Sequence, residues 1–282
     1  MKAETIHRLL RRMALLPALL GVSCMNSTLL PLPPGVKREA DVRYTPDHWP
    51  KPLLADVYHR PGEPAAPAVL LIHGGSWAEN GSRWTMNPIA KALVRRGYVV
   101  VNVSYRGIPG DRYPAPIEDL REAIRWMRAN AARHGIDGDK IATYGFSAGA
   151  HLAAQVALQD GNPSKVRAIV AASGPFNLSL DAGGDSVREF LGGTRDEIPD
   201  RFREASPVNH VTRSSPPIFI YHGTRDSLVP PEHASQMGAA YRKQGFDTTV
   251  HWLEGRKHAG VLLFPGKAVE VAIDFLDISL KR

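Results

Sequence analysis

The chain has a serine between two glycines, at the point where an apolar strand pattern gives way to a helical one. Residues 141–144 have the continuous apolar character of a buried strand, and residues 148–158 that of a packed helix. The connection is Gly-Phe-Ser-Ala-Gly, which is too short for an ordinary loop. Chance can produce this pentapeptide, but the strand before it and the helix after it favour a nucleophile elbow with Ser147 at the apex. The two glycines would let the backbones approach closely, because they carry no Cβ.

Strand and helix patterns alternate along most of the chain. Continuous apolar strands separated by helices predict a mostly parallel sheet with helices on both faces. We expect eight strands, at residues 38–44, 53–59, 68–73, 98–105, 141–144, 166–173, 217–222 and 248–253. Helices are expected at residues 87–97, 113–135, 148–158, 230–245 and 265–280.

Two segments need separate predictions. The long helix at 113–135 carries one apolar stripe formed by Ile117, Leu120, Ile124 and Met127, which we expect to face the core. Residues 176–207 are polar and glycine-rich, so they are expected to cover the strand ends without forming a large cap domain.

The first residues are typical of an export signal. Three arginines precede an apolar run at 13–23, which is too short to span a bilayer unaided. The next residue is Cys24, the sole cysteine, in a Leu-Gly-Val-Ser-Cys stretch that resembles the lipobox of bacterial lipoproteins. We expect export to the cell envelope or periplasm, with Cys24 as a lipid-attachment site that tethers the chain to a membrane. A plain cleaved signal with an incidental cysteine is the alternative.

These observations divide the chain into an export signal (1–23), a proline-rich tether (24–40) and a catalytic domain (41–282). A lone cysteine excludes a disulfide framework and a thiolate zinc site, and no metal or cofactor is expected. The formal net charge is +7, but the basic residues are scattered, which favours a solvated surface over nucleic-acid binding.

A serine nucleophile needs a base and an acid, and in open parallel sheets such side chains lie just after strands. Among eleven histidines, His258 stands in a polar loop after the last strand, where it could reach the elbow. His73 and His222 end strands before glycines, and we interpret both as structural. Asp226, four residues past His222, is the expected acid. The order Ser147, Asp226, His258 is that of α/β-hydrolases. The aspartates that compete with Asp226 do not follow a strand expected beside the elbow: Asp181, Asp185, Asp196 and Asp247.

The oxyanion of an acyl-transfer reaction needs hydrogen-bond donors. One is expected to be the backbone N–H of Ala148, directly after the nucleophile. The others would come from Gly74 and Gly75 in the His-Gly-Gly-Ser-Trp stretch after the third strand. In that stretch, Trp77 is expected to contact substrate.

These motifs together resemble the α/β-hydrolase esterase/lipase group related to hormone-sensitive lipase. The chain is most similar to the subgroup called BD-FAE, after a bifunctional feruloyl and acetylxylan esterase. The matching stretches run in order from about residue 41 to the C-terminus: LLIHGGSW, VNVSYR, YPAPIEDLREAIRWM, HGIDGDKIATYGFSAGAHLAA, YHGTRDSLVP and the loop of His258. The resemblance implies an α/β-hydrolase fold, the catalytic triad Ser147, Asp226 and His258, and oxyanion donors at Gly74, Gly75 and Ala148.

The resemblance also implies a serine carboxylesterase for small or aromatic acyl esters, either free or linked to polysaccharide, acting through an acyl-enzyme. His-Gly-Gly-x-Trp also resembles the motif of kynurenine formamidases, so an arylformamidase is the alternative; an export signal argues against it. A non-catalytic binding protein on a hydrolase scaffold is disfavoured, because all three triad positions are filled.

Overall fold

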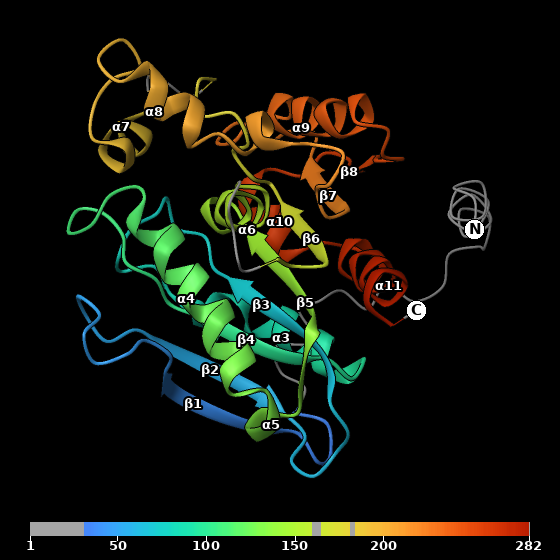
Figure 1. Ribbon diagram of the computed structural model, residues 1–282. Coiled ribbons are helices and arrows are strands. Elements are labelled where there is room, and N and C mark those ends of the chain that lie inside the picture. Colours follow the sequence, from blue (N-terminus) through green and yellow to red (C-terminus); the bar gives the residue numbers. More distant parts are fainter. Residues whose placement is uncertain (1–30, 160–164, 181–183, 282) are drawn as a thin grey trace, which may run out of the picture.

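The computed structural model describes residues 31–159, 165–180 and 184–281, and its centre is one eight-stranded sheet (Figure 1). The expected export signal and Cys24 lie outside the described residues. The strand order is β1-β2-β4-β3-β5-β6-β7-β8. In sequence the strands are β1 (Lys37–Arg43), β2 (Leu54–His59), β3 (Ala66–Ile72), β4 (Val99–Val103), β5 (Ile136–Phe146), β6 (Ala168–Ala172), β7 (Ile218–Gly223) and β8 (Val250–Leu253).

The sheet is mostly parallel, as its continuous apolar strands predict. β2 pairs antiparallel with both of its neighbours, β1 and β4, and every other pairing is parallel. All residues of β4 and β6 are buried, because helices cover both faces of the sheet. In contrast, β1 is an exposed edge strand.

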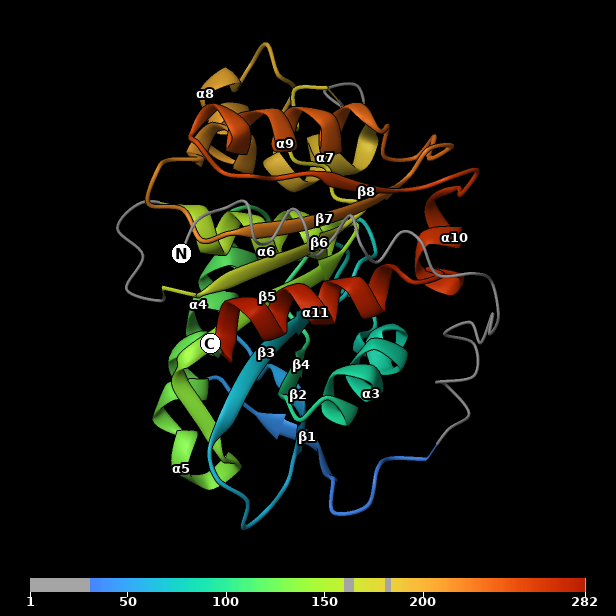
Figure 2. The ribbon, with the colours of Figure 1, turned by 90° about the vertical axis from the view of Figure 1, so that its right-hand side faces the viewer.

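Each face of the sheet has its own helices. α4 (Ala115–Ala129), α6 (Ala148–Leu158) and α9 (Glu232–Lys243) pack on one face. α3 (Asn87–Arg95) and α11 (Ala268–Leu280) pack on the other, which faces the viewer in Figure 2. This arrangement confirms the expected fold class, an α/β-hydrolase sheet covered by helices on both sides.

The predicted helix at 113–135 is in fact two helices. α4 ends at Ala129, and a short α5 (Ala131–His134) follows it. Asn130 separates them because its side-chain amide donates to the carbonyl of Trp126, at 2.9 Å, and its own backbone leaves the helical region. The apolar stripe is nevertheless correct, since its four residues are fully buried.

The covering segment and the last polar loop contain helices that the sequence patterns did not predict. α7 (Asp185–Leu191) and α8 (Pro199–Glu204) each insert a fully buried phenylalanine, Phe190 and Phe202, into the core. The expected loop of His258 is instead the start of α10 (His258–Leu263). Two 3-10 turns, η2 (Arg83–Met86) and η3 (Pro207–His210), complete the described elements.

The sheet begins earlier than the expected domain boundary at residue 41. β1 starts at Lys37, inside the segment assigned to the tether, and Lys37 pairs with His59 of β2. Among the helices of the described residues, none combines the length and the apolar character that crossing a bilayer requires.

Candidate active site

Ser147 lies on a strained turn between β5 and α6. Its φ of 56° and ψ of −124° place a non-glycine residue in a positive-φ conformation, as a nucleophile elbow requires. Its backbone N–H donates to the carbonyl of Ala172 on β6, at 2.8 Å, which anchors the turn to the neighbouring strand.

The glycines that flank Ser147 allow the chain to fold back on itself. A Cβ added to Gly145 would lie 2.0 Å from the carbonyl oxygen of Gly149. One added to Gly149 would lie 2.3 Å from the carbonyl oxygen of Ile72, on β3. Neither position has room for any side chain, which is the physical reason for the Gly-x-Ser-x-Gly pattern.

The structure brings Ser147, His258 and Asp226 together, although 111 residues separate the serine from the histidine. The Nε2 atom of His258 lies 2.9 Å from Oγ of Ser147, and its Nδ1 atom lies 2.7 Å from Oδ2 of Asp226. With the proton on Nδ1, His258 donates to Asp226 and presents a free lone pair to the serine hydroxyl.

Asp226 is held as an anion by several donors. Its Oδ1 atom accepts hydrogen bonds from the backbone N–H groups of Leu228 and Val229, at 3.1 and 2.9 Å. Burial by itself would raise the pKa of Asp226, but the hydrogen bonds from His258 and Val229 outweigh it and hold that pKa below its ordinary value. A charged carboxylate at this position can orient His258 and stabilise its protonated form.

The loop after β3 lies against the elbow. A Cβ added to Gly74 would lie 3.0 Å from Cβ of Ser147, so the Gly74 backbone passes directly beside the serine. Gly75 has a φ of 116°, which favours glycine. Ala148 is the first residue of α6, where a backbone N–H has no acceptor in a preceding helical turn. The three expected oxyanion donors therefore lie on the two segments that meet at Ser147.

Trp77 was expected to contact substrate, but its side chain is packed in the core. The indole is 3% exposed and stacks on Phe190, with ring centroids 4.6 Å apart. Its N–H donates to Nδ1 of His151, at 3.1 Å, and His151 in turn bonds the carbonyl of Ala205, at 2.7 Å. Trp77 thus ties the Gly74–Gly75 loop to α6 and to the segment after α8.

His73 and His222 have the structural roles that their positions predicted. His73 bonds the carbonyl of Gly74 at 2.7 Å and stacks on Tyr105. Burial lowers the pKa of His73 to about 4, which keeps the ring neutral. His222 bonds the carbonyl of Val229 at 2.8 Å and so supports the loop that carries Asp226.

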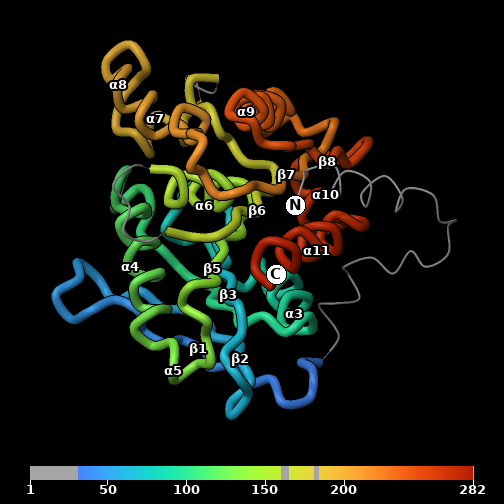
Figure 3. Tube along the Cα trace, turned by 45° about the vertical axis from the view of Figure 1, so that its right-hand side comes forward, coloured from blue at the N-terminus to red at the C-terminus, as the bar shows by residue number. Residues whose placement is uncertain are grey.

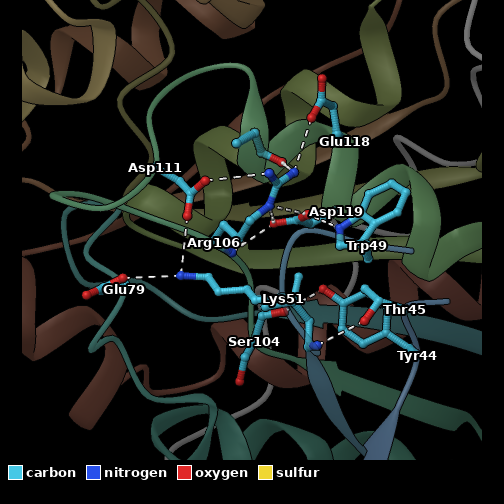
Figure 4. Close-up of polar contacts among 12 residues, drawn as sticks. Tyr44, Thr45, Trp49, Lys51, Glu79, Ser104, Arg106, Asp111, Glu118 and Asp119 are labelled. Carbon is cyan, nitrogen blue, oxygen red and sulfur yellow. Dashed lines mark hydrogen bonds and ion pairs between the residues drawn. The ribbon is translucent and has the colours of Figure 1, made fainter. Parts of the chain in front are cut away.

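A cleft of about 320 Å³ lies beside the Gly74–Gly75 loop. It is polar on several sides and is lined by Ser76, Ala78, Glu79, Asn80, Ile108, Pro109, Ser186 and Glu189. Ionic contacts hold its wall: Lys51 bridges Glu79 and Asp111, at 3.2 and 3.3 Å (Figure 4). Sequence patterns did not reveal this cleft, since its lining comes from two separate loops and α7.

Behind this wall lies a buried ion pair. Nε of Arg106 lies 2.9 Å from Oδ1 of Asp119, which also accepts a hydrogen bond from the indole N–H of Trp49, at 2.7 Å (Figure 4). Arg106 also reaches Asp111 at 3.5 Å, so the exposed contacts of the cleft wall are anchored to α4.

A family model described as BD-FAE matches residues 55–241 of the chain. This chain belongs to the BD-FAE family. Esterase LipQ of Mycobacterium tuberculosis is 32% identical over 256 residues, and the match covers 80% of this chain and 59% of LipQ. The chain spans about half the length of the curated relatives it matches.

Solved structures agree with the family assignment. A truncated carbohydrate esterase from gut microbiota is 25% identical with a TM-score of 0.79, and the match covers 87% of this chain and 97% of that one. Esterase 2 of Thermogutta terrifontis, solved with propionate bound, is 26% identical with a TM-score of 0.72. That match covers 86% of this chain and 94% of the Thermogutta esterase.

Proposed function

We propose that this BD-FAE protein is a serine carboxylesterase that hydrolyses small or aromatic acyl esters. The observation that carries the proposal is the continuous hydrogen-bonded series from Ser147 through His258 to Asp226, at 2.9 and 2.7 Å, on a strained elbow. The similar proteins reported above are named as esterases, which supports ester hydrolysis as the reaction.

In the proposed reaction, Oγ of Ser147 attacks the ester carbonyl carbon while Nε2 of His258 accepts its proton. The resulting imidazolium is stabilised by Asp226 and then protonates the departing alcohol, which leaves an acyl group on Ser147. A water molecule, deprotonated by His258, attacks the acyl carbon, and the acid is released as Ser147 regains its proton.

The negative charge of each tetrahedral intermediate would be stabilised by the backbone N–H of Ala148 and by those of Gly74 and Gly75. Such donors need no reorganisation during the reaction, because backbone segments already hold them beside the serine. Losing one donor typically costs about 3 kcal/mol of transition-state stabilisation.

The cleft beside the oxyanion loop supports a substrate with a hydroxyl-rich alcohol part, such as a polysaccharide-linked ester. Its lining offers hydroxyls from Ser76 and Ser186 and carboxylates from Glu79 and Glu189, which can accept hydrogen bonds from sugar hydroxyls.

The proposal is tested by comparing the protein with its Ser147→Ala variant. Substrates would be p-nitrophenyl esters of rising chain length, methyl ferulate, acetylxylan and N-formylkynurenine. We expect ester turnover to fall by roughly three orders of magnitude or more in the variant. Ester turnover that survives the substitution would refute the nucleophile, and a preference for N-formylkynurenine would replace the esterase by an arylformamidase.

We also propose that the protein is exported and held at the membrane by a lipid on Cys24. Labelling with palmitate in a bacterial host tests this proposal. We expect label in the natural chain and none in a Cys24→Ala variant. Equal labelling of both, or of neither, would contradict the anchor.

A further inference from the structure

Three side chains capable of binding a metal meet far from Ser147. Glu39 lies on β1, His59 is the last residue of β2 and His134 is the last residue of α5. Figures 1 and 3 show α5 well separated from α10, the helix that begins at His258. β5 runs from near His134 to Ser147, and its 11 residues span roughly 30 Å.

The geometry of this group, which we call the Glu39–His59–His134 cluster, is that of convergent ligands. One potential ligand atom from each side chain lies within 4.8 Å of the other two. Nε2 of His59 is 3.0 Å from Oε1 of Glu39, and the two imidazole rings meet edge to face with centroids 5.1 Å apart.

His134 supplies an independent observation. Its side chain is fully buried, yet neither ring nitrogen has a hydrogen-bond partner among the described residues. Nδ1 of His59 is likewise buried and has no hydrogen-bond partner among the residues that the structure describes. Buried polar atoms are nearly always satisfied, so the unpartnered nitrogens of these two adjacent imidazoles are available to a ligand.

We propose that the Glu39–His59–His134 cluster binds a divalent transition-metal ion, with Zn²⁺ as the preferred ion. Two imidazoles and one carboxylate are a common zinc ligand set, with a fourth position left for water. Ligand atoms of a tetrahedral zinc lie about 3.3 Å apart, so a closure of about 1.5 Å or less completes the site.

The neighbouring cations leave room for a metal. Lys37 and Arg133 contact Glu39 at 3.2 and 3.4 Å, but their side chains are 59% and 66% exposed. Exposed pairs of this kind contribute little stability, so both long side chains can turn into solvent when an ion binds Glu39. The ion would join the exposed edge strand β1 to β2 and α5, and its effect would be on stability and not on ester hydrolysis.

The test is zinc binding by the full chain without a histidine tag, measured by isothermal titration calorimetry and by metal analysis after dialysis. We expect one ion per chain. At a free zinc concentration of 100 times Kd, the ratio of folded to unfolded protein should rise about 100-fold in chemical denaturation. Co²⁺ should bind at the same position and produce visible absorption bands.

Variants distinguish this site from surface binding. Glu39→Gln, on the exposed edge strand, should weaken zinc binding at least tenfold, and His134→Ala should abolish it. His48→Ala, which changes an exposed histidine, should bind zinc like the natural chain. Absence of saturable binding, or equal affinity in Glu39→Gln and the natural chain, would overturn the proposal. If His134→Ala does not fold, Glu39→Gln decides the outcome.

Discussion

At the scale of single residues, the site depends on the order of hydrogen bonds around His258. Asp226 accepts from His258 and from two backbone N–H groups, so its charge and position are both held. In Asp226→Asn the amide can present its N–H₂ group to Nδ1 of His258 and favour the wrong tautomer. We expect kcat to fall by about 10⁴-fold with the fold retained. Steady-state kinetics and circular dichroism check this, and a variant with near-natural kcat would contradict the role of Asp226.

A second prediction at this scale concerns the elbow glycines. In Gly149→Ala the new Cβ would lie 2.3 Å from the carbonyl oxygen of Ile72, which cannot move without distorting β3. We expect the free energy of unfolding to fall by roughly 3 kcal/mol or more. Gly138→Ala is the matched control on β5, since its Cβ would only touch Arg128 at 3.5 Å. Equal stability of the two variants in urea unfolding would be inconsistent with this account.

At the scale of elements, Trp77 connects the oxyanion loop to α6 and α7. Trp77→Phe keeps an aromatic ring on Phe190 but leaves Nδ1 of His151 buried without its donor. We expect a loss of about 1–3 kcal/mol in the free energy of unfolding and a lower kcat with little change in KM. Trp84→Phe is the control, because Trp84 is 67% exposed and should tolerate the change. Natural stability and kcat in Trp77→Phe would show that the bond to His151 is dispensable.

At the scale of the whole molecule, buried histidines couple stability to pH. Burial lowers the pKa of His151 to about 4, against an ordinary value near 6.5. The unfolded chain therefore binds more protons than the folded one between these pH values. The stabilising contribution of the neutral His151 ring is thus complete above pH 6.5 and is lost as the pH falls toward 4. The contribution of His151 is roughly 3 kcal/mol. In His151→Gln this part of the pH dependence should disappear, which urea unfolding at pH 4.5 and 7 will measure. An unchanged difference between the two pH values would mean that His151 does not titrate as described.

Local sequence patterns were enough to predict the sheet, the elbow and the chain order of Ser147, Asp226 and His258. A buried strand followed by Gly-Phe-Ser-Ala-Gly and a helix leaves few alternatives, and catalytic side chains after strands meet at one sheet edge. The direction of the Trp77 side chain, the break in the helix after Pro114 and the loops that line the cleft could be learned only from the folded chain. It also brought Glu39, His59 and His134 together. These features depend on contacts between segments that are distant in the chain. Neither the hydrophobic period of an element nor the spacing of a motif indicates which buried groups become neighbours in the folded protein.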